Sequence, residues 1–105
     1  MKVQEKDGDL IDIYAIYWIG DETFFLGFPR NYGGLKVYNL SKVNVVDENI
    51  CGNFVFHKNN NINSVCHWAL IKDKLLDDIL ELDETAYKRF LEILKAEGRI
   101  DPDFY

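Results

Sequence analysis

Residues 10–29 read LIDIYAIYWIGDETFFLGFP, and this stretch decides the fold. From Ile11 to Ile19 the side chain at every second position is apolar, and Asp12 and Trp18 fall between them. This alternation predicts a β-strand with one buried face, formed by Ile11, Ile13, Ala15, Tyr17 and Ile19. The polar turn at residues 20–22 leads into a second apolar run, so the stretch predicts a β-hairpin that ends before Pro29.

Further segments downstream have the β-branched and aromatic composition of strands and lie between turn-forming residues. Their connections are short, which favours antiparallel pairing. One connection, residues 58–63, is too polar to be buried and is expected to be a loop. With the hairpin, these segments predict a mostly antiparallel sheet of about six strands; they are residues 35–38, 43–46, 50–57 and 65–71.

The pattern changes near residue 71, where apolar side chains begin to recur with helical spacing. A first helix is expected over residues 72–82. Asp83 is a candidate N-cap for a second helix, which Gly98 would end. Strands followed by helices indicate an α+β domain with the helices packed on one side of the sheet. We therefore expect a single domain over residues 1–105, with a β-rich part (1–71), two helices (72–98) and a short tail (99–105).

The composition fits a small soluble domain. The 105 residues are 48% hydrophobic and 29% charged, which argues against disorder. Eighteen acidic against twelve basic side chains give a net charge of −6, and this argues against direct binding of nucleic acid. The start of the chain lacks a secretory pattern, and no apolar run reaches the ~20 residues of a membrane span. A cytoplasmic protein without membrane contact is therefore expected.

Histidine and cysteine side chains suggest two alternative chemistries. His57 and His67 could act as general acid and base on a phosphodiester, provided that the strand register puts them on one face. Cys51 and Cys66 would complete a zinc-binding quartet with them, but the spacing lacks a pair such as C-x2-C, and adjacent strand residues point to opposite faces. The sequence contains no nucleophile, phosphate-binding or dinucleotide motif, so we expect neither an enzyme nor a cofactor.

An acidic cluster distinguishes the C-terminal half. Six acidic side chains and a single basic one, Lys74, lie between residues 73 and 84. Four of these acids would share the exposed side of the first predicted helix, where like charges four positions apart are destabilising; they are Asp73, Asp77, Asp78 and Glu81. One interpretation is a solvated helix face, and the other is a docking surface for a basic partner. The candidate contacts are Asp73, Asp77, Asp78, Glu81 and Glu84.

The aromatic residues suggest a second part of such an interface. Eleven of the fifteen lie between Tyr14 and Trp68. Six of these are already more than one face of a small sheet can bury, namely Tyr14, Tyr17, Trp18, Phe24, Phe25 and Phe28. Trp18 and Tyr32 are candidate anchors, because Tyr and Trp concentrate binding energy at interfaces. The alternative is that helices and loops cover both faces of the sheet.

Four segments are the basis of a resemblance to a known family: residues 25–29 (FLGFP), the strand segments 43–47 and 53–57, and the acidic helix 73–81. In these segments the chain resembles small immunity proteins of contact-dependent growth inhibition and other polymorphic bacterial toxin systems. The resemblance covers the whole chain. It implies a compact, acidic, non-catalytic cytoplasmic protein that binds the C-terminal domain of a cognate toxin one to one and neutralises it. Many such toxins are basic nucleases, which would suit an acidic inhibitor. Two alternatives are a phosphodiester-cleaving enzyme that uses His57 and His67, and a regulatory domain that binds a small ligand.

Overall fold

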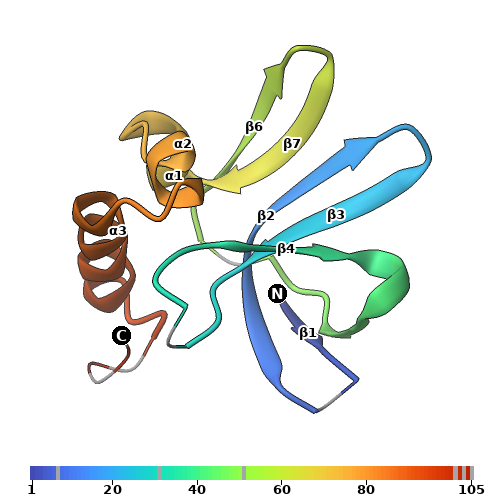
Figure 1. Cartoon of the computed structure of the whole chain (residues 1–105), viewed down its shortest axis with the longest axis horizontal. Coiled ribbons are helices and arrows are strands. Elements are labelled where there is room, and N and C mark those ends of the chain that lie inside the picture. Colours follow the sequence, from blue (N-terminus) through green and yellow to red (C-terminus); the bar gives the residue numbers. More distant parts are fainter. Residues whose placement is uncertain (7, 31, 51, 101, 103, 105) are drawn as a thin grey trace.

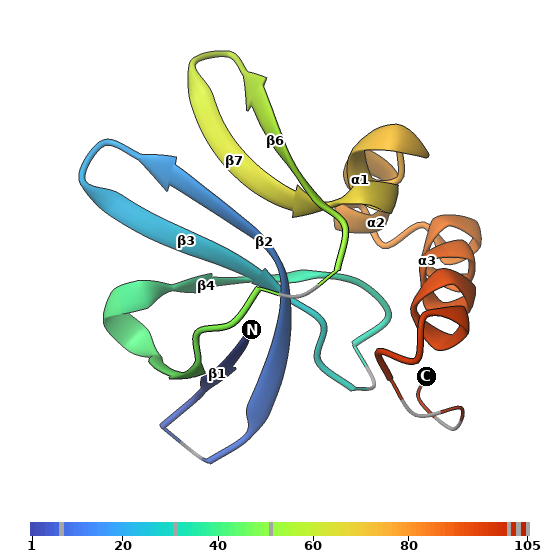
Figure 2. The same ribbon diagram turned by 180° about the vertical axis from the view of Figure 1, so that it is seen from behind.

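A computed structural model describes residues 1–6, 8–30, 32–50, 52–100, 102 and 104. Within them the chain forms seven antiparallel strands and a group of helices that lies to one side of the sheet (Figures 1 and 2). This confirms the predicted α+β class, with seven strands where about six were expected. The strands are β1 (Lys2–Gln4), β2 (Leu10–Ile19), β3 (Glu22–Gly27), β4 (Lys36–Asn39), β5 (Asn44–Asp47), β6 (Phe54–Asn59) and β7 (Ile62–His67).

Strand β2 organises the sheet because it is long enough to pair with two strands along one edge. Its first residues, Leu10 to Asp12, pair with β1, and residues 15–18 pair with β7. Its other edge pairs with β3. The strand order is therefore β4-β3-β2-β1-β5, with the β6–β7 hairpin attached beside the second half of β2. Figure 1 shows the β2–β3 and β6–β7 hairpins projecting away from helix α3 (Glu84–Ala96).

A bulge in the middle of β2 interrupts the predicted alternation. The register with β3 shifts between Ile13 and Ala15, so Tyr14 is an extra residue in the strand. Tyr14 and Ala15 both pack into the core under the helices, whereas Ile13 and Ile16 pack into a second core. The assignment of the odd-numbered residues from Ile11 to Ile19 to a single face is therefore wrong, because one inserted residue exchanges the two faces for every later position.

Two hydrophobic cores result from this arrangement. The smaller core is enclosed by β1 to β4 and consists of Val3, Ile11, Ile13, Ile16, Phe25 and Tyr38. The larger core lies under the helices and is centred on Phe28, whose ring stacks on Tyr87 and Phe104 at centroid distances of 5.5 and 5.1 Å. Much of the aromatic content is therefore buried, in two cores and not against one sheet face.

The helix α3 closely matches the second predicted helix. The Asp83 side chain accepts a hydrogen bond from the backbone N–H of Ala86 at 2.9 Å and so caps the first turn. The chain leaves the helix at Gly98, which has a φ of 71° that favours glycine. Tyr87, Phe90 and Leu94 are buried, as their helical spacing indicates.

Of the first predicted helix, residues 72–82, only a short helix α2 (Leu76–Leu80) forms, and another short helix, α1 (Trp68–Lys72), precedes it where a strand was predicted. The break between them includes Lys74, which has a φ of 56° and is therefore not helical. Strand β7 ends at His67, although the sequence predicted a strand up to residue 71. The reason is that the Nδ1 atom of His67 accepts the backbone N–H of Ala69 at 3.1 Å and starts a helix there.

Smaller differences concern the ends of the strands. Strand β1 was not among the predicted strands, and β6 begins at Phe54 and not at residue 50. The expectation of a loop at residues 58–63 is mostly wrong, because β6 continues to Asn59 and β7 starts at Ile62. Only Asn60 and Asn61, with φ values of 51° and 66°, form the tight turn between them. A 3-10 turn, η1 (Leu40–Lys42), links β4 to β5. In the described part of the chain, no helix is long and apolar enough to span a bilayer.

Candidate partner-binding groove

The five candidate acidic contacts do not form one surface. Asp73 lies at the end of α1, and its carboxylate is 3.5 Å from the Arg89 guanidinium. Glu84 on α3 lies 3.0 Å from the ammonium of Lys88. Both carboxylates therefore have a basic neighbour. The prediction that Asp73 shares a helix face with the acids at 77, 78 and 81 is wrong, because the helix is broken at Lys74.

The other three acids lie together on α2. Asp77 and Asp78 occupy its first turn and Glu81 is its C-cap. All three are exposed, and among the described residues none of them forms an ion pair. The helix dipole favours the first two positions but not the third, because the C-terminal end of a helix is electronegative. These three residues are hereafter called the α2 acids.

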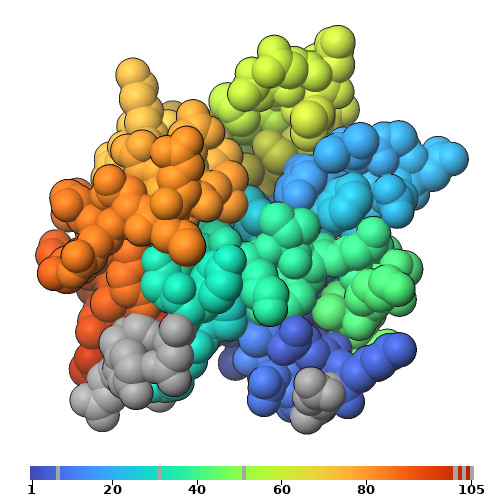
Figure 3. Space-filling view, in the orientation of Figure 1, coloured from blue at the N-terminus to red at the C-terminus, as the bar shows by residue number. Residues whose placement is uncertain are grey.

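Helix α2 forms one wall of an apolar groove of about 220 Å³. Leu76 and Leu80, four residues apart on α2, face the sheet across it. Figure 3 shows the surface hollowed between the orange α1–α2 segment, the yellow-green β6–β7 hairpin and the blue β2–β3 hairpin. Leu80 is 42% exposed and Val37, on β4, is 49% exposed, so apolar surface in and around this groove is open to solvent.

The floor of the groove is a row of side chains from neighbouring strands. The strand register places Ala15 opposite both Leu26 and Cys66, and Leu26 opposite Val37. In the next row, the ring of Tyr17 stacks on that of Phe24 with centroids 5.2 Å apart. The bulge determines this floor, since it brings Ala15 and Tyr17 to this face of β2.

The two candidate aromatic anchors lie apart from this floor. Trp18 is 40% exposed, and it points to the opposite face of β2 from Tyr17. Tyr32 is 44% exposed and belongs to the loop between β3 and β4. That loop abuts α2, because a Cβ atom added to Gly34 would lie 2.9 Å from the carbonyl oxygen of Ile79. The structure therefore places the loop of Tyr32 beside α2, but not Trp18.

The strand register separates the two histidines. His57 lies opposite Ser64, and His67 lies opposite Phe54, which puts the imidazoles on opposite faces of the β6–β7 hairpin. His57 lines the apolar groove, whereas His67 is completely buried. A shared acid–base site therefore does not form, since it would need the other register parity. Among the described residues, no group of three His, Cys, Asp or Glu side chains could hold a metal ion; Cys51 lies outside them.

His67 belongs to a buried network that the sequence did not indicate. Its Nδ1 atom accepts a hydrogen bond from Ala69, so the ring proton is assigned to Nε2, which lies 2.7 Å from a carboxylate oxygen of Glu97. The other carboxylate oxygen of Glu97 accepts a hydrogen bond of 2.7 Å from Trp68 Nε1. Burial acts to raise the pKa of Glu97, but hydrogen bonds from Trp68 and His67 and the charge of Arg99 outweigh it, so the pKa is lowered. We regard the contact with Glu97 as a hydrogen bond from neutral imidazole, because protonated Nδ1 would lose the cap of α1.

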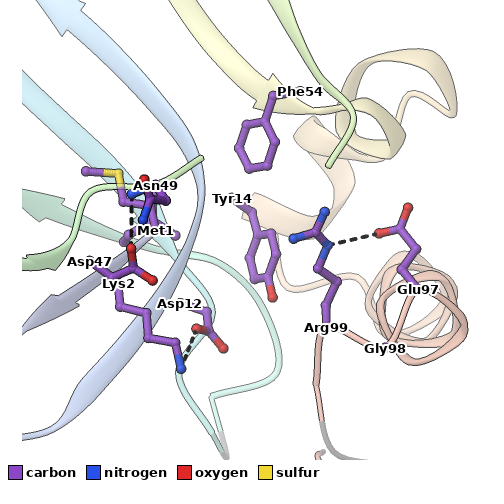
Figure 4. A pocket seen from close by; sticks show the side chains of 11 residues that line it. Met1, Lys2, Asp12, Tyr14, Asp47, Asn49, Phe54, Glu97, Gly98 and Arg99 are labelled. Atoms are coloured by element: carbon purple, nitrogen blue, oxygen red, sulfur yellow. Dashed lines mark hydrogen bonds and ion pairs between the residues drawn. The ribbon is translucent and has the colours of Figure 1, made fainter. Parts of the chain in front are cut away.

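Beside this network is a polar pocket of about 270 Å³ between β1, β2 and the end of α3 (Figure 4). Its charges are mostly paired within the chain. Lys2 lies 3.6 Å from Asp12, and the Nε atom of Arg99 lies 3.8 Å from Glu97. Burial raises the pKa of Tyr14, and nearby Asp12 raises it further, so its hydroxyl stays protonated at neutral pH. The charges of this pocket are therefore largely balanced within the chain, one pair in the sheet and one at the end of α3, and the α2 groove is the better candidate for binding a partner.

Comparison with known proteins found no family model, no curated protein and no solved structure that matches the chain.

Proposed function

We propose that the chain is an immunity protein, which binds the C-terminal domain of a cognate toxin one to one in the cytoplasm and neutralises it. The observation that carries this proposal is the set of three α2 acids, without basic partners among the described residues, beside an open apolar groove. A basic nuclease domain is the partner whose charge suits this surface. The protein itself has no catalytic part in this proposal.

The apolar groove and the α2 acids would contribute to binding in different ways. Burial of Leu80 and Val37 against an apolar segment of the toxin removes exposed hydrocarbon from water and supplies affinity. The α2 acids attract a basic domain from a distance and orient it, which raises the association rate and contributes to specificity. In the free protein the dipole of α2 favours Asp77 and Asp78 but not Glu81, and a basic partner would supply the ion pairs that all three lack among the described residues.

The alternatives have weaker support. A phosphodiester-cleaving site with His57 and His67 conflicts with their positions on opposite faces of the hairpin. A small-ligand site in the apolar groove would need more enclosed space, because ligand pockets commonly hold about 300–1,000 Å³ and this groove holds about 220 Å³.

The proposal is tested by coexpressing the chain with the product of the neighbouring upstream gene and measuring complex formation and protection of the cells. The key variant is the charge reversal of Asp77→Lys with Asp78→Lys. We expect association to slow about tenfold at low salt and to depend less on salt, because steering by opposite charges is lost.

The matched control is Glu48→Lys with Glu92→Lys, which changes the net charge equally at exposed positions outside the groove. The control should slow association much less. An equal effect of both variants would contradict the α2 face as the docking site. Absence of a complex and of protection with the wild-type chain would contradict the function itself.

A further inference from the structure

A second surface hollow, of about 480 Å³, lies between the β1–β2 turn and the loop that joins β3 to β4. Its lining differs from that of the apolar groove, because it combines two tyrosine rings with two carboxylates from another part of the chain. Tyr32 and Leu10 at its surface are exposed, whereas Tyr38 beneath them is buried. Hereafter it is called the tyrosine groove, and the residues that matter here are Glu5, Asp9, Leu10, Tyr32, Lys36 and Tyr38.

The tyrosine groove already holds a cation that belongs to the chain. The ammonium of Lys36 lies 6.0 Å from the ring centroid of Tyr32 and 5.8 Å from that of Tyr38. Both distances are near the outer limit for a cation–π interaction. Lys36 is exposed and forms no ion pair with any described residue. It is therefore held loosely.

The carboxylates make the interior of the groove attractive to positive charge. Glu5 and Asp9 line the same groove as Tyr38. Burial, together with the charges of Glu5, Tyr32 and Asp9, raises the pKa of Tyr38 to about 12. Neither carboxylate has an ion pair or a side-chain hydrogen bond in the described part of the chain. The guanidinium of Arg30, which also lines the groove, lies over the ring of Phe104 at 4.8 Å. Two carboxylates and two basic side chains therefore line the groove, and of the two cations Lys36 has the longer contacts with aromatic rings.

We propose that the tyrosine groove binds an arginine or lysine side chain on an extended segment of a protein partner, and that Lys36 is a resident cation which the partner displaces. Tyr32 and Tyr38 would offer their ring faces to the incoming cation, and Glu5 and Asp9 would balance its charge. Exposed Leu10 would contact an apolar neighbour in the segment. This site does not depend on the partner being a toxin; if the proposed function holds, it provides a second contact on the same partner.

The probe is the peptide acetyl-Ala-Arg-Leu-amide, titrated into the isotope-labelled full chain and followed by NMR chemical shifts. The neutral peptide acetyl-Ala-Gln-Leu-amide is the ligand control. We expect shift changes for residues around Tyr32, Lys36 and Tyr38 with the arginine peptide only. Tyr32→Ala should weaken binding about two- to fivefold, which is the effect of losing one exposed cation–π contact.

The decisive variant is Lys36→Gln, because it removes the competing cation and should tighten binding about two- to fivefold. Its matched control is Lys42→Gln, an exposed lysine on η1 outside the groove, which should leave the Kd unchanged. Weaker or unchanged binding by Lys36→Gln would overturn the displacement model. An equal gain in both variants would show a net-charge effect and also overturn it. Binding of the neutral peptide with equal affinity, or no binding of either peptide, would overturn the site. None of these outcomes depends on the toxin complex.

Discussion

At the scale of single residues, His67 shows how one buried polar side chain can hold several elements together. Both of its ring nitrogens have hydrogen-bond partners, one in α1 and one at the end of α3. Its ring also lies within 6.0 Å of those of Tyr14, Phe54 and Phe90. A fully satisfied buried group stabilises a particular arrangement, because any other arrangement leaves its nitrogens without partners.

The carboxylate of Glu97 should make stability depend on acid pH. Its pKa in the folded chain is below the ordinary value of 4.5, so the unfolded chain binds a proton first as pH falls. The stabilisation is complete above about pH 4.5 and is lost as the pH falls through the lowered pKa. Glu97→Gln should cost about 1–3 kcal/mol at pH 7, because an amide cannot accept both hydrogen bonds as a carboxylate does.

Urea unfolding between pH 7 and pH 3 measures this effect, with Glu92→Gln as the exposed control. The free energy of unfolding of the wild type should approach that of Glu97→Gln at the acid end. A constant difference between the two across this range would contradict the assigned role of the carboxylate.

The buried hydroxyl of Tyr87, unlike the ring nitrogens of His67, has no hydrogen-bond partner in the described part of the chain. An unpaired buried hydroxyl destabilises the folded state, while the ring itself stacks on Phe28. Tyr87→Phe keeps the ring and should raise the free energy of unfolding by up to about 1 kcal/mol. Urea unfolding measures the change, with exposed Tyr32→Phe as a control that should have no effect. A loss of stability would mean that the hydroxyl has a partner such as an ordered water.

At the scale of elements, the β6–β7 turn is set by backbone conformation. Asn61 has a φ of 66°, which glycine adopts without steric cost and β-branched residues strongly disfavour. Asn61→Gly should stabilise the chain by about 0.5 kcal/mol, whereas Asn61→Val should destabilise it by about 1–2 kcal/mol. The control is Asn63→Gly, inside β7, which should destabilise because glycine weakens a strand. The prediction fails in urea unfolding if both glycine variants shift stability in the same direction.

The length of an element and its local sequence signals explain which elements can be predicted from sequence. Helix α3 has 13 residues, an Asp83 cap and a terminal glycine, so its local signals agree with its packing. Helices α1 and α2 have five residues each, too few to be stable alone, and they owe their form to contacts made elsewhere in the fold. Periodicity therefore extended a strand over α1 and a helix on both sides of α2, from residue 72 to residue 82.

At the scale of the whole molecule, the candidate site was predictable in part. The exposed acids near residues 77–81 follow from the sequence, as does the i,i+4 pair of Glu84 and Lys88. The contact of Asp73 with Arg89 could not be predicted from the sequence, because 16 residues separate them. The apolar groove depends on strand register and on one bulge, and neither has a clear local signal.

The bulged strand β2 determines how the molecule unfolds. Since its side chains belong to both cores, neither core can lose its packing without disturbing the strand that the other one needs. The sheet half and the helical half are thus thermodynamically coupled into one cooperative unit, with β2 as the last segment whose amides become open to hydrogen exchange. A partner seated on α2 would then slow exchange throughout β2, including amides that it does not touch.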